Sequence, residues 1–235
     1  TFLARHGVAG QLTDLQAVTV SAASTTVNEA ATSQLAAAAV FTDASVLPLA
    51  TSAVTWSVSG GGLASVNSSG LVTAATVYQN TNGVARADYL GQFGTLTLSV
   101  LNVGTDDFGS YAGDSVDDAW QVQHFGIGSA SAAATADPDG DGQNNLFEYL
   151  AGTTPTSGAS LFNVTIANTG ASQRSVTFSP LAAGRSYTVE YRTNLFTGGF
   201  APAAGGMSGG GASQTFTDAS ATNSARYYRV RISLP

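Results

Sequence analysis

The stretch that decides the fold is AVTWSVSGGGLASVNSSGLVTA, residues 53–74. From Val54 to Val58 apolar side chains alternate with Thr and Ser, and a period of two is typical of a strand with one buried face. The runs 60–62 and 67–70 are rich in Gly, Asn and Ser, which favour turns. The stretch therefore predicts short strands joined by tight turns.

The same pattern continues on both sides of this stretch. From Leu96 to Val100 apolar residues again alternate with Thr and Ser. The run Ala36–Ala39 could be helical by propensity, but it lies among strands and we predict a strand there too. The side chains of that strand expected to point inward are Leu35, Ala37, Ala39 and Phe41. Several short strands at this spacing indicate a β-sandwich over residues 15–104.

A family resemblance supports the sandwich. The segments VTWS, residues 54–57, and ASVNSSGLVT, residues 64–73, resemble the pattern of bacterial Ig-like domains of group 2. The resemblance covers about residues 15–103 and departs at residues 79–93, where the loop is longer than is usual in the family. It implies an Ig-like sandwich of the kind found in bacterial surface adhesins and as spacers in secreted enzymes. A fold of this kind does not by itself define a function.

The sequence changes character after residue 104. Residues 105–158 predict two short helices around an acidic loop. The first helix would have Asp114 or Ser115 as its N-cap. The second would run from Asn144 to Ala151 and stop at Gly152, since glycine commonly ends a helix.

Residues 159–235 return to strand patterns. Apolar alternation at 176–178, 187–191 and 228–232 predicts a smaller second sandwich, with 205–211 as a glycine-rich loop. This part is similar to a β domain at the C-terminal ends of exported bacterial proteins. We therefore expect a mainly β protein with an N-terminal arm (residues 1–14) and two β-sandwich domains, which a short helix-loop-helix (residues 105–158) joins.

The calcium prediction rests on DPDGDGQNNLFE, residues 137–148, which match D-x-D-x-D-G-x5-E. Calcium takes six to eight hard oxygen ligands, and this spacing supplies them from one loop and the helix after it. The predicted ligands are the side chains of Asp137, Asp139, Asp141 and Glu148, the backbone carbonyl of Gln143, and Asn145 through its side chain or a water. The loop resembles those of dockerins, EF-hands and thrombospondin type 3 repeats. Glu148, at the position that closes such loops, favours a Ca²⁺ site over a solvated acidic turn.

A partial repeat lies upstream, where residues 114–121 align with residues 141–148. Ser110 and Ala112 stand in place of the first two aspartates, and Gln121 in place of the closing glutamate. We therefore expect a degenerate half without a metal of its own. Carboxylates that could still help a second, weaker cation are Asp106, Asp107, Asp117 and Asp118.

The amino-acid composition argues against several classes of function. Only 10% of the residues are charged, the net charge is −7, and there is no cysteine for a disulfide or thiolate site. Residues 106–148 hold nine of the fifteen acids and no Arg. The sequence has no basic patch that could neutralise phosphates, which argues against nucleic-acid binding. No apolar run reaches the length of a membrane span. The two histidines, His6 and His124, form no catalytic constellation, so we expect no enzyme.

Two functions remain open. The first is a secreted structural or adhesive surface protein, a calcium-stabilised subunit of an extracellular filament or layer. It would join head to tail with other copies, with arm residues Phe2, Leu3 and Val8 adding to a neighbouring sheet. The second is a non-catalytic C-terminal region of a larger secreted enzyme, binding surface glycans through tyrosines. Candidate stacking residues are Tyr187, Tyr191, Tyr227 and Tyr228. The chain begins at Thr1, which is consistent with a removed signal peptide or with a missing N-terminal segment.

Overall fold

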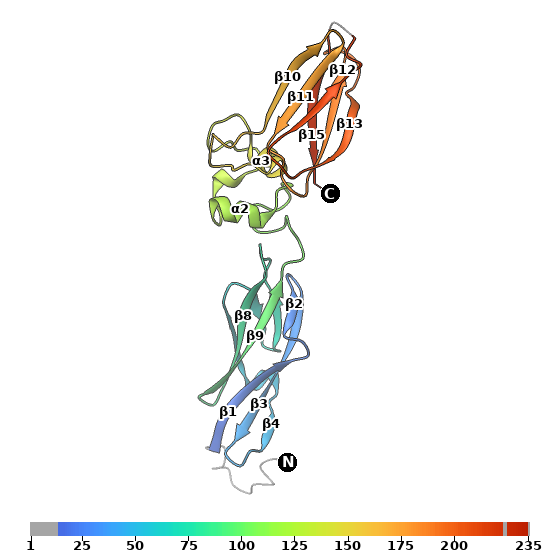
Figure 1. The fold of residues 1–235 in the computed structure, drawn as a ribbon. Coiled ribbons are helices and arrows are strands. Elements are labelled where there is room, and N and C mark those ends of the chain that lie inside the picture. The colour runs from blue at the N-terminus through green and yellow to red at the C-terminus, as the bar shows by residue number, and fades with distance from the viewer. Residues whose placement is uncertain (1–13, 223–224, 235) are drawn as a thin grey trace. The chain divides into compact units, whose positions relative to one another are not determined.

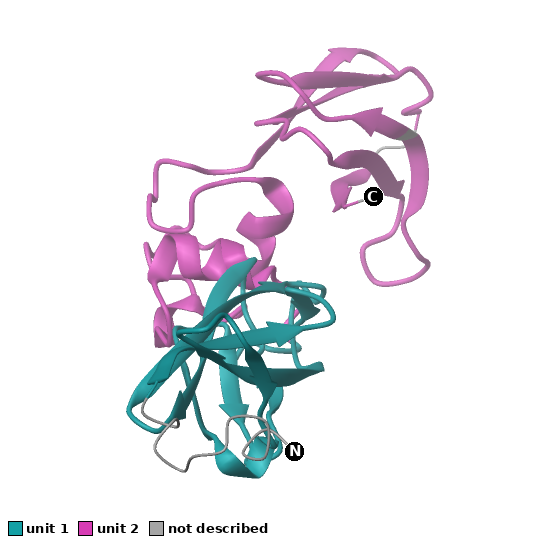
Figure 2. Ribbon diagram, turned by 90° about the horizontal axis from the view of Figure 1, so that it is seen from below, with its two compact units in different colours: residues 1–113 teal, residues 114–235 magenta. Residues whose placement is uncertain are grey.

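The computed structural model describes residues 14–222 and 225–234, so the predicted arm lies outside the described residues except for Asp14. As predicted, the protein is mainly β. Antiparallel sheets form an N-terminal Ig-like region and a C-terminal β region, and two short helices separate them in the chain (Figure 1). The chain divides into two compact units, residues 1–113 and 114–235 (Figure 2).

The Ig-like region is built from two sheets. One has the order β1-β3-β7-β6, with β4 beside β3, and the other has the order β2-β9-β8-β5. The strands of the first sheet are β1 (Leu15–Ala22), β3 (Thr32–Phe41), β4 (Val46–Pro48), β6 (Leu63–Val66) and β7 (Leu71–Ala74). Those of the second are β2 (Thr26–Asn28), β5 (Thr55–Ser59), β8 (Thr81–Tyr89) and β9 (Gln92–Leu101), and the 3-10 turn η2 (Thr51–Ala53) precedes β5.

The alanine run 36–39 is a strand, as predicted. β3 pairs antiparallel with β1, so that Ala39 lies opposite Val18. The alternate side chains predicted to point inward are all buried: Leu35, Ala37, Ala39 and Phe41. Pairing and burial of one face outweigh the helical propensity of alanine, which is a weak preference in a tertiary context.

Glu29 is a buried acid that the sequence did not single out. Its carboxylate accepts backbone hydrogen bonds from Val77 (2.9 Å), Val103 (2.6 Å) and Gly104 (2.8 Å). Burial raises the pKa of Glu29, but the three backbone donors outweigh burial and lower it. The side chain thereby joins β2 to the segment that leaves β9.

The second unit begins with the helices α2 (Asp118–Phe125), η3 (Ala130–Ala132) and α3 (Asn145–Ala151). The prediction of Asp114 or Ser115 as the first N-cap was wrong, because Asp117 caps α2 by accepting the Trp120 N–H at 2.9 Å. Ser115 has a φ of +71°, which no right-handed helix accommodates. The second helix is capped by Asn144 and ends at Gly152 in the left-handed conformation, as predicted.

The C-terminal β region also has two sheets, ordered β10-β11-β14 and β13-β12-β15. The strands are β10 (Asn163–Gly170), β11 (Gln173–Ser179), β12 (Ser186–Arg192), β13 (Ala201–Ser208), β14 (Gln214–Asp218) and β15 (Tyr227–Ser233). The core contains Val176, Phe178, Tyr187 and Val189, which come from the segments where apolar alternation predicted strands and which are fully buried.

One expectation for this region was wrong. The predicted loop at 205–211 begins within β13, where Met207 pairs with Tyr187 of β12. Glycines carry no side-chain pattern, so the sequence did not indicate this pairing. Glu190 of β12 is buried, and its carboxylate forms ion pairs with Arg229 (2.6 Å) and Arg231 (3.3 Å).

Candidate calcium site

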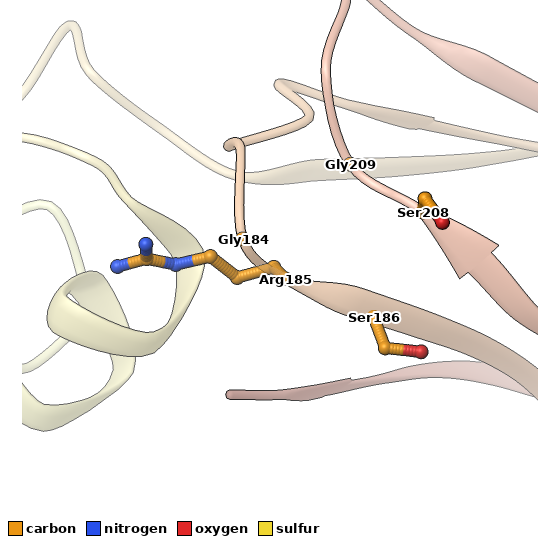
Figure 3. Close-up of a pocket in the computed structure, with 5 residues that line it drawn as sticks. All are labelled: Gly184, Arg185, Ser186, Ser208 and Gly209. Atoms are coloured by element: carbon orange, nitrogen blue, oxygen red, sulfur yellow. The ribbon is translucent and has the colours of Figure 1, made fainter. Parts of the chain in front are cut away.

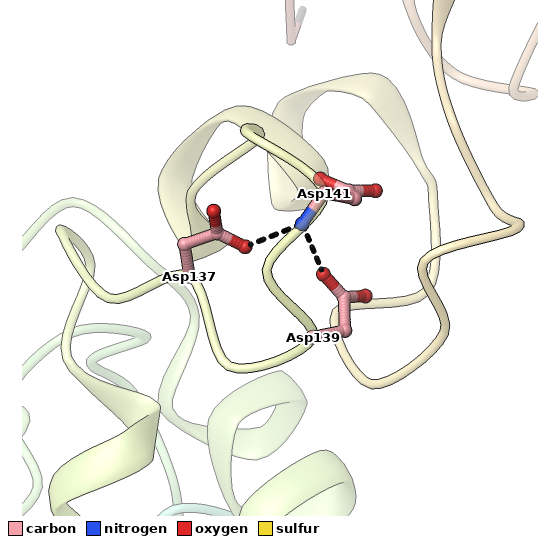
Figure 4. A group of neighbouring side chains, drawn as sticks. All are labelled: Asp137, Asp139 and Asp141. Carbon is pink, nitrogen blue, oxygen red and sulfur yellow. Dashed lines mark hydrogen bonds between the residues drawn. The ribbon is translucent and has the colours of Figure 1, made fainter.

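The acidic loop brings three carboxylates together. Ligand oxygens of Asp137, Asp139 and Asp141 all lie within 4.8 Å of one another (Figure 4). The loop curls because Asp137 accepts the N–H groups of Gly140 (3.0 Å), Asp141 (3.2 Å) and Gly142 (2.9 Å). Gly142 has a φ of +92°, which suits glycine, at the position where calcium loops turn sharply. Such a cluster could hold a metal ion.

Glu148 and Asn145 lie in α3 and are not part of this group of three carboxylates. Both side chains are fully buried. Burial, and then the negative charges of Asp139 and Asp141, raise the pKa of Glu148 to about 7. The Asn145 side-chain nitrogen donates to the carbonyls of Ser131 (2.7 Å) and Ala133 (2.8 Å). The side-chain oxygen is therefore the atom of Asn145 that could act as a ligand.

Within the described residues, four buried oxygens of the loop and α3 have no hydrogen-bond partner: Asp139 Oδ2, Asp141 Oδ2, Asn145 Oδ1 and Glu148 Oε2. They occupy positions 3, 5, 9 and 12 of the loop, which supply side-chain or water-mediated ligands in calcium loops. A buried acceptor without a partner costs about 1–3 kcal/mol, and more when it is charged. A divalent cation would satisfy these oxygens and offset the repulsion among the carboxylates. The residues present therefore fit Ca²⁺.

Gln143 links the loop to the C-terminal β region. Its side-chain nitrogen donates to the Phe162 carbonyl, and its side-chain oxygen accepts the Phe162 N–H, both at 3.0 Å. The Phe147 ring also meets the Phe162 ring edge-on at 6.0 Å. With the Gln143 side chain engaged in this way, only its backbone carbonyl remains for the predicted metal contact.

The C-terminal end of α3 is held by Arg185. Its guanidinium donates to the carbonyls of Tyr149 (2.9 Å) and Leu150 (3.3 Å) in the last turn of the helix. Figure 3 shows Arg185 extending toward this helix from a pocket that Gly184, Ser186, Ser208 and Gly209 also line. The sequence did not reveal the roles of Arg185 and the Gln143 side chain, because neither belongs to a local motif.

The upstream half shares one backbone feature with the acidic loop but differs in its side-chain chemistry. Ser115 has a positive φ where its counterpart Gly142 does. Gln121, the counterpart of Glu148, donates from Nε2 to Asp114 Oδ2 and to the Ala132 carbonyl, both at 2.8 Å. An amide group thus contacts the aspartate that corresponds to Asp141. Within the described residues, the cluster of three metal-ligating groups is the one at 137–141, and it includes none of Asp106, Asp107, Asp117 or Asp118.

The aromatic residues considered for glycan stacking differ in exposure. Tyr187 is fully buried, and the Tyr228 hydroxyl donates to the buried Asp218 at 2.8 Å. Tyr227 is 38% exposed. His124 packs against Trp120 in α2 with ring centroids 4.7 Å apart, and His6 lies outside the described residues.

Comparison with known proteins agrees with the sandwich. Residues 14–80 match the family model of the bacterial Ig-like domain (group 2), which starts where the resemblance does and ends before β8. This part of the chain is a group 2 bacterial Ig-like domain, of a family typical of bacterial surface proteins. No curated protein matches the chain. Among the described residues, the helices are too short and too polar to cross a membrane.

Proposed function

We propose that this is a secreted, non-enzymatic structural protein of the bacterial surface. Its acidic module would bind one Ca²⁺, and copies of the chain would join head to tail into an extracellular filament or layer. The Ig-like domain supports a surface location, because its family is typical of such proteins. The observation that carries the calcium role is the set of four buried oxygens without partners at residues 139, 141, 145 and 148.

Calcium has a structural consequence in this arrangement. The loop and α3 contact the C-terminal β region through Gln143, Phe147 and Arg185. Cation binding to the folded loop stabilises it by about 2.7 kcal/mol at a hundredfold excess over Kd. Metal binding would therefore hold the acidic module against the β region.

The distribution of charge supports the assembly proposal. Nine of the fifteen acids lie in residues 106–148, so the rest of the chain holds six acids and eight Arg, and contacts there would meet little charge repulsion. A heterologous contact between copies that does not close into a ring produces an open fibre.

Electron microscopy with millimolar calcium tests this function, with the Glu148→Gln variant as the comparison. Filaments are expected for the natural chain and fewer or shorter ones for the variant. Monodisperse monomers of the natural chain at high concentration with calcium would refute assembly, while the calcium role would still be measurable by calorimetry.

A further inference from the structure

Strand β10 is an open edge of the C-terminal β region. It forms one side of the sheet β10-β11-β14 and, within the described residues, pairs with β11 alone (Figure 1). All eight of its residues are exposed, whereas β11 buries Val176 and Phe178 completely.

Two apolar side chains of β10 lie on the core-facing side of this sheet. Val164 is directly opposite Phe178, and Ile166 is directly opposite Val176. Residues directly opposite each other in an antiparallel pair point to the same face. Val164 and Ile166 nevertheless remain 41% and 51% exposed. The core thus covers the apolar face of this sheet at β11 but leaves part of that face exposed at β10.

The other edge strands of this region carry features that discourage strand pairing. β15 presents Arg229 and Arg231, β13 contains Pro202, and β14 is only five residues long. Charge, proline and short length are the usual ways in which proteins protect sheet edges. β10, with the sequence NVTIANTG, has no charged residue and no proline, and its register shifts only near its end, between Asn168 and Gly170.

The geometry points to β10 as an acceptor for an added strand, and the occupant is the segment of residues 1–13 of a second copy of this chain. This inference rests on the proposed assembly and names its contact. The segment TFLARHGVAGQLT has no acid and no proline, and it carries Phe2, Leu3 and Val8. Main-chain hydrogen bonds would hold it along β10, and alternate apolar side chains would cover Val164 and Ile166.

The test uses two variants that each lack one side of the contact. A chain without residues 1–12 keeps the acceptor edge, and an Ile166→Lys chain keeps the donor segment while placing a charge on the edge. Each variant alone is expected to sediment as a monomer with calcium. Their equimolar mixture is expected to give a one-to-one dimer. Monomers in the mixture would overturn the inference. This is also the result expected if the segment folds back onto its own copy.

A synthetic peptide of residues 1–13 measures the contact without assembly. It should bind the shortened chain, and Ile166→Lys in that background should weaken binding at least about tenfold. Ile127→Lys is the matched control, because Ile127 is also exposed and lies outside β10; it should leave binding unchanged. Unchanged calcium binding verifies that each variant is folded.

The outcomes separate this inference from the proposed function. Filaments of the natural chain together with a peptide that does not bind would overturn the β10 contact and leave assembly standing. A binding peptide and a dimer-forming mixture, without filaments of the natural chain, would support the contact and refute the filament. Equal weakening by Ile166→Lys and Ile127→Lys would also overturn the assignment to β10.

Discussion

Gln143 and Phe162 exchange two hydrogen bonds, each 3.0 Å long, between the Gln143 side-chain amide and the backbone N–H and carbonyl of Phe162. The pair connects the seventh position of the acidic loop to the residue that precedes β10. It restricts both the loop and the start of the C-terminal β region. Metal binding at the loop and order in the β region are therefore expected to be linked.

Replacement of Gln143 tests this link. Gln143→Leu keeps the backbone carbonyl predicted to bind calcium but removes both hydrogen bonds, each worth about 1 kcal/mol net. We expect calcium affinity to fall by about tenfold or more, because part of the binding energy must then order the loop. Isothermal calorimetry measures the change, and Gln214→Leu at an exposed position of β14 is the control. Equal affinities in both variants would contradict the link.

Glu148→Gln tests the metal site. The substitution keeps the size of the buried side chain but removes its negative charge, so calcium binding should weaken by about a hundredfold. The matched control is Asp88→Asn, which removes a carboxylate from the surface pair with Arg86 and should leave calcium binding unchanged. A Glu148→Gln chain that binds calcium as tightly as the natural one would exclude Glu148 as a ligand.

Chelation should make the acidic module the first site of proteolysis. Without a cation, the carboxylates of the loop repel each other and the four buried oxygens remain without partners. We expect initial cleavage within residues 104–158 in chelator and protection when calcium is restored. Mass spectrometry of the first fragments locates the cut. The same cleavage rate with and without calcium would argue against calcium-dependent order.

Asp218 should make the C-terminal β region sensitive to acid. Burial raises the pKa of its carboxyl, but hydrogen bonds from Tyr228, Arg226 and Ser220 outweigh burial and lower the pKa to about 2. A carboxyl with a depressed pKa in the folded state adds stability above its ordinary pKa of 3.8, and this is lost as pH falls through about 2.

The expected loss in the free energy of unfolding between pH 5 and pH 2 is about 2 kcal/mol from this group. Urea unfolding followed by tyrosine signals at several pH values measures it. In Asp218→Asn this component of the pH dependence should disappear, and stability at neutral pH should fall because Arg226 loses its buried partner. A pH dependence identical to that of the natural chain would contradict the assignment.

Patterns in contiguous residues were enough to predict many of the strands and the acidic loop. Alternation in residues 53–74 predicted strands, and the pattern around Ala36–Ala39 predicted which side chains point inward, because strand geometry places every second residue on the same face. The spacing of residues 137–148 predicted which acids would meet, since one loop and one helical turn bring them together. Three of those acids do lie within 4.8 Å of one another.

Only the tertiary structure decided which polar groups are buried and with which partners. Gln143 meets Phe162 across 19 positions of the chain, and Glu190 is covered by Arg229 across 39. Such contacts depend on how separate elements pack, and no local period or spacing encodes them. The exposure of β10 has the same origin: the packing of the described elements leaves its apolar residues Val164 and Ile166 41% and 51% exposed. Packing between distant segments thus determined which side chains of this protein are buried and which strand edge stays exposed.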